Sequence, residues 1–433
     1  MQISNFVEEG LIHYKRTQCR LCGSMDLSCV VPMEPIPISE HYEVNACKDA
    51  KRYPIDIYQC NDCSAVQTLD EISADFLWKD YTYYSGMTTR IREHFREFAD
   101  SLVKRAYPDQ LGKVNGLAAL DVGCNDGTLL ESLRDKGFDV TGIDPADTVT
   151  SVCKGKGITT HVELFTRNNA EKIFRESKFS LVTAFNVFAH SSDLESFLEG
   201  VTYVLGDEGV FCFEVQYLAD VCQKHILGTF FHEHMVHYSI TALEAFLGRH
   251  GLEICTVDNN DIQMGSIIVY AAYSGSVMVR NLKDDEALKR LKKRERDLGI
   301  DNCSWSFGFR DKMLKNRRKA QEFIKEHREI AAYGAARSGP SLAIQNGISE
   351  KVSAIFDDHP AKVGKYSPFK GIRVQPSDEL TPANQKITVL LAYLHYKPIL
   401  RQNLEYMEEG GKFVLLWPEF AVVDQSNYRE IVG

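Results

Sequence analysis

Residues 117–144 contain the pattern that most restricts the fold: an apolar run, a turn with two glycines, a helical segment and a second apolar run. The stretch reads LAALDVGCNDGTLLESLRDKGFDVTGID. A strand, a glycine turn, a helix and a second strand in this order open a doubly wound parallel α/β sheet. We therefore expect an α/β fold that binds its ligand at the carboxyl edge of the sheet.

The glycine turn carries acidic groups. Gly123 and Gly127 flank Asn125 and Asp126, and Asp144 follows Gly123 by 21 residues, where it can accept hydrogen bonds from ribose hydroxyls. Asp126 would repel a phosphate at this place, which favours a cationic or neutral adenosine cofactor over a dinucleotide. These five residues are predicted to hold that cofactor.

Two polar residues follow the next apolar run, FSLVTAF. Asn186 comes directly after it and His190 four residues later. Both are expected at the ligand-binding edge of the sheet, where Asn186 is a candidate cofactor-binding residue. For His190 an ordinary loop position is the alternative interpretation.

A histidine-rich stretch, TFFHEHMVHYS, contains His232, Glu233, His234 and His237. The helical zinc motif H-E-x-x-H is excluded because Val236 stands four residues after His232. Adjacent side chains point in different directions, so one can face a substrate while its neighbour is fixed by contacts with the surrounding protein. A neutral histidine at a sheet edge is a candidate general base, since its pKa lies near working pH. The flanking aromatic residues argue against an exposed polar loop.

Residues 330–358 repeat the strand, glycine turn, helix and strand order as a second Rossmann-like unit. Its turn is not a Walker loop, because Pro340 and Ser341 stand where Lys and Ser or Thr are required. The turn can still hold a phosphate through Arg337 and backbone N–H groups. The alternatives to a phosphate site are an NAD site and a Rossmann-like domain that only packs against the rest of the protein. Candidate substrate-binding residues are Arg337, Ser338, Gly339 and, further on, Lys365.

Two C-x-x-C pairs supply the predicted metal ligands Cys19, Cys22, Cys60 and Cys63. Four thiolates in two tight turns suit tetrahedral zinc and leave no open position, so the metal is expected to be structural. A redox motif would need only one such pair, in a βαβ setting. Two unrelated reduced pairs are the remaining alternative.

The charge and the hydropathy pattern exclude several classes of protein. A formal net charge of −10 over 433 residues disfavours nucleic-acid binding, because that affinity comes mostly from Lys and Arg on phosphates. No stretch approaches the ~20 apolar residues of a membrane span. A soluble, cytoplasmic protein without nucleic-acid or membrane partners is therefore expected. Residues 281–328 are charged with sparse apolar positions at helical spacing, which predicts helices that bridge two domains.

The acidic turn LDVGCNDG resembles the first motif of class I S-adenosylmethionine-dependent methyltransferases. The chain as a whole resembles the sugar C-methyltransferases that act on nucleotide-linked keto-deoxysugars. Besides the cysteine pairs, the motifs that carry this resemblance follow in order: DYTYYSG (80–86), IREHF (91–95), LDVGCNDG (120–127), FNVFAH (185–190), FHEHMVHYS (231–239), AAYGAARSG (331–339), FDDHPAKVGKY (356–366) and GGKFVLLWPE (410–419).

The resemblance implies a mechanism and roles for individual residues. A base removes a proton from the carbon next to a ketone, and the enolate attacks the methyl group of S-adenosylmethionine. His234 would be the base, with Glu233 orienting it or binding substrate. His190 and a tyrosine of DYTYYSG, Tyr81 or Tyr83, would hold the sugar.

Three departures from the family pattern concern the acceptor more than the cofactor. The family commonly has Tyr at the position of Phe231, Gly at that of Met264 and Lys at that of Arg337. The expected architecture is a zinc-binding lobe (1–80), a class I methyltransferase Rossmann-like domain (81–280) and a second Rossmann-like α/β domain (281–433) that contacts the nucleotide sugar. The alternatives are methyl transfer to oxygen, nitrogen or another carbon acid, a zinc-ribbon binding protein without catalysis, and an NAD-dependent sugar enzyme.

Overall fold

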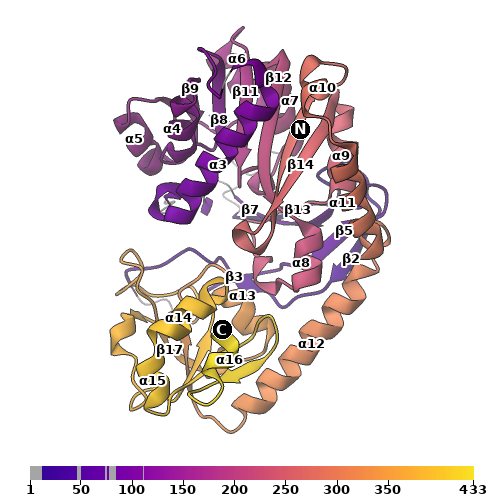
Figure 1. The fold of residues 1–433 in the computed structure, drawn as a ribbon. Helices are drawn as coiled ribbons and strands as arrows, with labels where there is room; N and C mark the ends of the chain where they lie inside the picture. The colour runs from indigo at the N-terminus through magenta and orange to yellow at the C-terminus, as the bar shows by residue number, and fades with distance from the viewer. Residues whose placement is uncertain (1–11, 46–49, 74–75, 78–83, 111) are drawn as a thin grey trace.

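A computed structural model of the protein describes residues 12–45, 50–73, 76–77, 84–110 and 112–433. A seven-stranded sheet lies in the upper part of Figure 1 and a six-stranded sheet in the lower part. The long helix α12 (Trp305–Ile324) runs between them along one side of the molecule. A small β lobe from the N-terminal part of the chain lies beside both domains.

The seven-stranded sheet has the order β10-β9-β8-β11-β12-β15-β14. Its first five strands are parallel, and β15 is antiparallel to both of its neighbours. The strands are β8 (Ala118–Val122), β9 (Asp139–Ile143), β10 (Thr159–His161), β11 (Phe179–Phe185), β12 (Leu205–Gln216), β14 (Leu252–Asn260) and β15 (Ser266–Tyr273). The helices are α3 (Thr89–Ala106), α4 (Thr128–Asp135), α5 (Asp147–Gly155), α6 (Arg167–Phe174), α7 (Leu194–Val204), α8 (Leu218–Lys224) and α9 (Ile240–Arg249).

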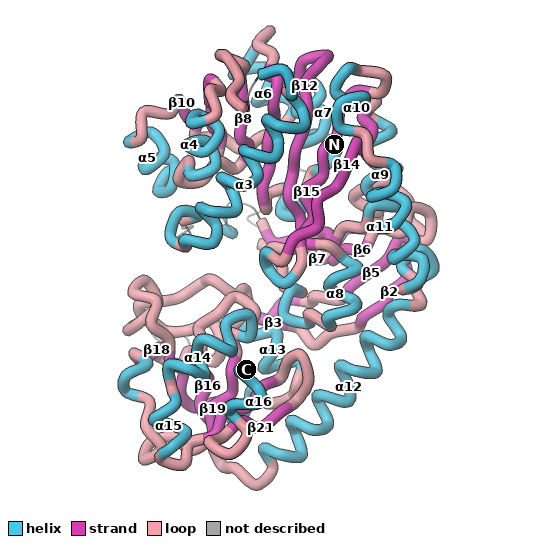
Figure 2. The backbone as a smooth tube through the Cα atoms, in the orientation of Figure 1, coloured by secondary structure: helices cyan, strands magenta, loops and turns pink. Residues whose placement is uncertain are grey.

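This sheet separates two hydrophobic cores, because successive side chains of a strand point to opposite faces. In β11, Leu181 belongs to the core that holds Leu102 of α3 and Leu130 of α4. Its neighbour Val182 belongs to the other core, with Phe197 of α7. Because helices cover both faces, the strand is apolar along nearly its whole length, as the run FSLVTAF predicts. Figure 2 shows the strands enclosed between the two layers of helices.

The N-terminal lobe contains β1 (His13–Lys15), β2 (Leu27–Val31), β3 (Ile36–Pro37), β4 (Arg52–Tyr53), β5 (Ile57–Cys60), β6 (Val66–Thr68) and β7 (Asp70–Ile72). Its main sheet is antiparallel with the order β13-β6-β5-β2. The edge strand β13 (Val236–His237) comes from the histidine-rich segment and places Val236 opposite Gln67. Residues that the sequence predicts for the middle domain therefore complete the sheet of the lobe.

Three helices connect the two large sheets: α10 (Val277–Leu282), α11 (Asp285–Asp297) and α12. They match the helices predicted for residues 281–328. Helix α11 is also fixed to the middle domain, because the buried carboxylate of Glu295 accepts hydrogen bonds from the backbone N–H groups of Ile240 and Thr241 at the start of α9. The hydroxyl of Tyr217 donates to the same carboxylate at 2.9 Å.

The six-stranded sheet has the order β18-β17-β16-β19-β20-β21, parallel except for β21. The order reverses between β16 and β19, and the predicted glycine turn follows β16 at this point. The elements are β16 (Ile330–Tyr333), α13 (Gly339–Gln345), β17 (Val352–Phe356), β18 (Val374–Gln375), β19 (Ile387–Leu390), α14 (Tyr396–Gln402), α15 (Leu404–Glu408), β20 (Lys412–Leu415), β21 (Ala421–Val423) and α16 (Tyr428–Val432).

The predicted fold class is confirmed: a small N-terminal lobe is followed along the chain by two α/β domains, each built around one sheet. Within the described part of the chain, no helix combines the length and the apolar character that a membrane span requires.

Candidate active site

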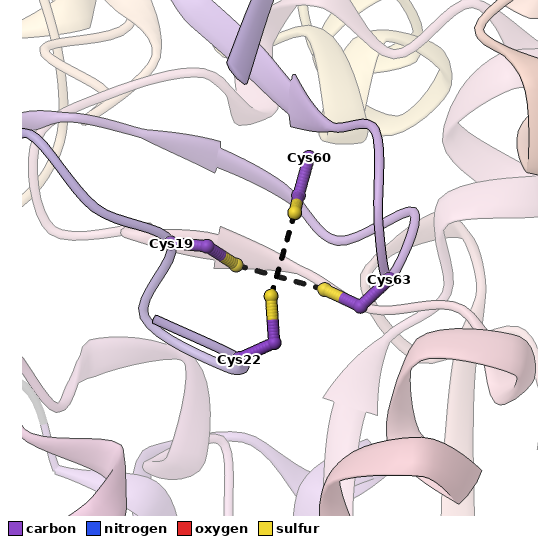
Figure 3. A group of neighbouring side chains, drawn as sticks. All are labelled: Cys19, Cys22, Cys60 and Cys63. Carbon is purple, nitrogen blue, oxygen red and sulfur yellow. Dashed lines mark hydrogen bonds between the residues drawn. The ribbon is translucent and has the colours of Figure 1, made fainter. Parts of the chain in front are cut away.

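The four predicted metal ligands converge in the N-terminal lobe, as Figure 3 shows. All four sulfur atoms lie within 4.8 Å of one another. The Sγ atoms of Cys19 and Cys63 are 3.6 Å apart, and those of Cys22 and Cys60 are 3.5 Å apart. Zinc–sulfur bonds of about 2.3 Å in a tetrahedron place sulfur atoms ~3.8 Å apart, so the cluster fits zinc. Four protein ligands make this a structural site.

The cysteine cluster is linked directly to the histidine-rich segment. Gln67 of β6 donates from Nε2 to the sulfur of Cys19 at 3.1 Å. The same residue pairs in the sheet with Val236 of β13, and the backbone N–H of Thr68 donates to the carbonyl of Met235 at 3.1 Å. The zinc site therefore supports the strand that begins two residues after His234.

The predicted cofactor turn follows β8 and has three residues with positive φ: Gly123 (+73°), Asn125 (+50°) and Gly127 (+78°). A Cβ atom at Gly123 would lie 2.2 Å from Cγ2 of Val187. One at Gly127 would lie 2.6 Å from Sγ of Cys153. Both glycines are needed for conformation and for space, which lets the backbone at this turn approach a ligand closely.

Asp144 directly follows β9 beside this turn, as predicted. Its carboxylate accepts hydrogen bonds from the backbone N–H of Asn125 at 3.0 Å and from that of Ala146 at 2.9 Å. Burial raises its pKa from the ordinary value. Asp121, within β8, is also buried and accepts from the hydroxyl of Thr183 at 2.7 Å. The carboxylate of Asp144, which follows the second strand, fits the ribose side of an adenosine cofactor.

Asp126 and Asn125 bind the segment that precedes α3. Oδ2 of Asp126 accepts from the backbone N–H of Gly86 at 2.8 Å, and Oδ1 of Asn125 accepts from that of Ser85 at 3.0 Å. A Cβ atom on Gly86 would lie 2.7 Å from Oγ1 of Thr128, so only glycine fits there. The cofactor turn therefore holds the end of DYTYYSG directly against itself. Tyr81 and Tyr83 lie outside the described residues.

Asn186 belongs to a buried polar cluster around Glu214, which the sequence did not assign to the site. Asn186 follows β11 with φ +57° and donates from Nδ2 to Glu214 at 3.1 Å. Glu214 of β12 is fully buried and also bonds Nε2 of His94 and Nδ2 of Asn260, each at 2.8 Å. Its carboxylate thus joins α3, the end of β11 and β14 beside the cofactor turn. Of this cluster, the sequence signalled Asn186 and, through the motif IREHF, His94.

His190 and His234 lie together at the edge of the sheet, with ring centroids 5.0 Å apart. Both line a small pocket whose lining residues are Asn186, Ala189, His190, Val215, Gln216, His234, Val236, His237 and Gln263. Burial lowers the pKa of His190 to about 4, and burial with the nearby His190 and His237 lowers that of His234 well below its ordinary value. Both imidazoles are therefore neutral at pH 7.

Thr229 orients His234, a role that the sequence did not reveal. Nδ1 of His234 lies 2.9 Å from the carbonyl oxygen of Thr229 and 3.0 Å from its Oγ1. The ring of Phe231 lies 4.0 Å from that of His234, centroid to centroid. Among the described residues, Nε2 of His234 has no hydrogen-bond partner, and the ring is only partly buried. The neutral ring with hydrogen on Nδ1 therefore has a basic nitrogen available at the pocket.

Glu233 faces away from His234 and toward the C-terminal domain. Its carboxylate is buried, Oε2 has no partner, and Oε1 lies 3.9 Å from Nε of Arg337. Of the two roles expected for Glu233, orientation of His234 is not seen, because Thr229 occupies that position. Glu40 of the N-terminal lobe lies 3.6 Å from Arg337 and 3.0 Å from Nζ of Lys362. Acidic and basic groups from three parts of the chain thus meet here.

The other predicted substrate-binding residues are distributed around this cluster. Ser338 is buried and donates to the carbonyl of Leu391 at 3.3 Å, and Gly339 begins α13. Lys365 is half-buried, and its side chain forms no ion pair or hydrogen bond within the described residues. The structure therefore places Arg337 beside Glu233 and Glu40, whereas the hydroxyl of Ser338 bonds the main chain just after β19.

Three family descriptions match consecutive parts of the chain. "Putative zinc binding domain" matches residues 19–78, "Methyltransferase domain" residues 91–257 and "C-methyltransferase C-terminal domain" residues 261–418.

One curated relative matches along nearly the whole chain. C-methyltransferase NovU of Streptomyces niveus is 28% identical over 421 residues, which are 95% of this chain and 97% of that protein. The ubiquinone biosynthesis O-methyltransferase of Rhodopseudomonas palustris (strain BisA53) is 28% identical over 141 residues, 32% of this chain and 55% of that protein. Among solved structures, the magnesium protoporphyrin IX methyltransferase of Synechocystis PCC 6803 is 19% identical and covers 43% of this chain and 85% of that chain, with a TM-score of 0.34.

The zinc-binding, methyltransferase and C-methyltransferase matches follow one another in the order that the structure shows, and the match to NovU runs through all three. The chain is therefore an S-adenosylmethionine-dependent methyltransferase that matches, in order, a zinc-binding domain, a methyltransferase domain and a C-methyltransferase C-terminal domain, and it is similar to a C-methyltransferase over nearly its whole length.

Proposed function

We propose that the protein transfers a methyl group to the carbon next to the ketone of a nucleotide-linked keto-deoxysugar. The observation that carries this proposal is the neutral pair His190 and His234 at the pocket beside the cofactor turn. Methyl transfer to carbon requires removal of a C–H proton, which an oxygen or nitrogen nucleophile does not need. A positioned neutral imidazole meets that requirement.

His234 is the proposed base. Its Nδ1 is held by Thr229, so the lone pair of a neutral ring is on Nε2. Burial keeps the ring neutral at pH 7. Phe231, at 4.0 Å, covers one side of the ring and limits its hydration. The nitrogen that receives the proton therefore meets the substrate in a fixed orientation.

His190 has a different proposed role. Nδ1 of His190 lies 2.6 Å from the carbonyl oxygen of Glu233, to which it donates. In the neutral ring the other nitrogen, Nε2, can then only accept a hydrogen bond. His190 is therefore suited to hold a hydroxyl of the sugar. Tyr81 or Tyr83, just before the segment that Asn125 and Asp126 bind, is proposed to hold the sugar together with His190.

S-adenosylmethionine supplies, when bound, an electrophilic methyl group on a sulfonium centre. Gly123, Asn125, Gly127 and Asp144 are proposed to bind its adenosine portion, because they form the close-approach turn and the acidic group beside it. Asn186 is fixed by Glu214 and borders the pocket. These residues orient the cofactor toward the pocket that contains His234.

Arg337 and Lys362 support an acceptor that carries phosphate. Both cations lie beside Glu40, at 3.6 and 3.0 Å, and Arg337 also lies 3.9 Å from Glu233. Burial raises the pKa of Glu233, and the nearby Arg337 opposes this shift. A diphosphate can bind to such a pair by charge-assisted hydrogen bonds. The free keto sugar without its nucleotide is therefore expected to be a poor acceptor.

The test is methyl transfer from labelled S-adenosylmethionine to a panel of dTDP-, GDP- and CDP-linked 4-keto sugars. Label is expected on a sugar carbon. In D2O with S-adenosylhomocysteine in place of the methyl donor, the wild-type protein should also exchange the hydrogen next to the ketone. His234→Asn should lose both exchange and transfer, whereas His190→Asn should retain exchange and show a raised KM.

Label on oxygen or nitrogen, or no transfer across the panel while the cofactor binds, would refute the proposed acceptor. Wild-type exchange by His234→Asn would remove His234 as the base.

A further inference from the structure

The side-chain amide of Gln216, at the end of β12, lies between two groups of opposite hydrogen-bonding character. Nε2 of Gln216 donates to the carbonyl oxygen of Gln263 at 3.2 Å. On its other side, Oε1 of Gln216 accepts the hydroxyl hydrogen of Thr229. A main-chain carbonyl can only accept, so the NH2 group must face Gln263 and the carbonyl oxygen must face Thr229. The direction of both hydrogen bonds is therefore determined.

This direction has a consequence for Thr229. A hydroxyl has one hydrogen, and here Gln216 receives it, so only lone pairs of Oγ1 face His234. Oγ1 and the carbonyl oxygen of Thr229 lie 3.0 and 2.9 Å from Nδ1 of His234, and both can then only accept. Two acceptors on one ring nitrogen require a hydrogen on that nitrogen.

We propose that Gln216 is a positioning residue that selects the tautomer of His234 through Thr229, so that the lone pair is on Nε2. Without Gln216 the hydroxyl of Thr229 could rotate and donate to Nδ1 in competition with the carbonyl of Thr229, which would move the ring hydrogen to Nε2 in part of the population and leave that part without a base at the pocket. The proposal rests on the proposed role of His234 as base, but the tautomer can be measured without turnover.

The turn that supplies the carbonyl for Gln216 has an unusual backbone. Gln263 (φ +49°, ψ +35°) and Met264 (φ +71°) both adopt the left-handed region, which non-glycine residues seldom do. Nζ of Lys224 bonds the carbonyl of Met264 at 2.5 Å, and a Cβ atom on Gly265 would meet Asp220 at 2.5 Å. Such strain persists where the surroundings hold it, and it occurs mostly at functional sites. Here it aims a carbonyl oxygen at Gln216.

No acidic group competes for the hydrogen of His234 among the described contacts of this ring. The titratable and charged groups that face this ring are His190, His237 and Arg337. The ring centroids of His190 and His237 lie 5.0 and 6.2 Å from that of His234, and each of the three groups disfavours a second proton on the ring. Thr229 and Gln216 therefore determine which of the two neutral tautomers of His234 is populated.

The test uses 15N-histidine NMR of the zinc-loaded full-length protein, with the His234 signals assigned by comparison with His234→Asn. The variants are Gln216→Met, which keeps the length of the side chain, Thr229→Val, which removes the hydroxyl but keeps the shape, and the double variant. Wild type should show hydrogen on Nδ1. Gln216→Met should show a population with hydrogen on Nε2. Thr229→Val and the double variant should return to Nδ1, because the hydroxyl that could donate is absent and the carbonyl remains.

Turnover should follow the same pattern. In Gln216→Met, kcat should fall roughly 3- to 10-fold, the range that one neutral hydrogen bond supports, with KM little changed. The double variant should have the kcat of Thr229→Val alone.

An unchanged tautomer in Gln216→Met would overturn the proposal. A raised KM with effects that multiply in the double variant would instead show that Gln216 contacts the acceptor directly. If the tautomer shifts as expected without any change in kcat, Gln216 does control the tautomer through Thr229, but His234 is not the base. Failure of the Gln216 proposal and failure of the proposed base can therefore be told apart.

Discussion

Alanine at Gly123 provides a direct test of the cofactor turn, because the chain contains a matched control. Gly123 and Gly157 have the same positive φ of +73°. A Cβ atom at Gly123 would lie 2.2 and 3.1 Å from the two methyl carbons of Val187, whereas at Gly157 nothing lies within 4 Å. The two substitutions therefore share the conformational penalty and differ only in the clash.

The expected magnitudes follow from that difference. The left-handed conformation costs an L-residue about 1–2 kcal/mol, and both variants bear this cost. Gly123→Ala adds overpacking of about 1–3 kcal/mol. Val187 can relieve the clash only by moving, and it directly follows Asn186 at the pocket. If the added cost falls on the bound state, affinity for S-adenosylmethionine weakens by a factor of about 5 to 150.

Calorimetric titration of both variants with S-adenosylmethionine measures this. Gly157→Ala should bind as wild type, although slightly destabilised, and Gly123→Ala should bind far more weakly. Equal affinities in the two variants would refute the conclusion that the turn requires glycine at position 123 for space at the cofactor.

Two further predictions concern zinc and pH. Zinc removal by a chelator, or Cys22→Ser, should abolish methyl transfer while S-adenosylmethionine still binds, because β13 loses its support. The control is Cys29→Ser, an exposed position on the same lobe, which should retain zinc and activity. Full turnover without zinc would contradict this prediction. Burial lowers the pKa of His225 and His232 to about 4, so below pH 6.5 the unfolded chain binds more protons than the folded one. The urea concentration at the midpoint of unfolding should therefore fall as the pH drops from 6.5 toward 4, and it should fall less steeply in His225→Asn. A midpoint that stays constant or rises over this pH range would refute the prediction.

The cofactor turn and the metal ligands could be predicted because local sequence determines them. Gly123 and Gly127 are needed where the chain takes positive φ, and the C-x-x-C spacing alone builds half of a tetrahedral site. The acidic residue at the end of the second strand, Asp144, follows from strand length in the same way. Such features depend on neighbours along the chain, which sequence patterns record.

The partners of the active-site histidine could not be predicted, because they depend on contacts between distant segments. Gln216 meets Thr229 only after α8 has turned the chain back toward the sheet. Glu214 gathers donors from α3 and β14, far from it in sequence. The alternation of adjacent side chains correctly indicated that Glu233 and His234 face different ways, but not that Arg337 would lie opposite Glu233.

The position of β13 at the edge of the lobe's sheet has a consequence for the order of folding. Ribosomes deliver the N-terminal part first, so β2, β5 and β6 are complete long before residues 236–237 exist. Until then β6 presents unpaired backbone groups, which can pair with other nascent chains. Early zinc binding would keep this edge in a defined shape, ready for the late strand. Zinc supply during growth should therefore govern the yield of correctly assembled protein as well as its stability.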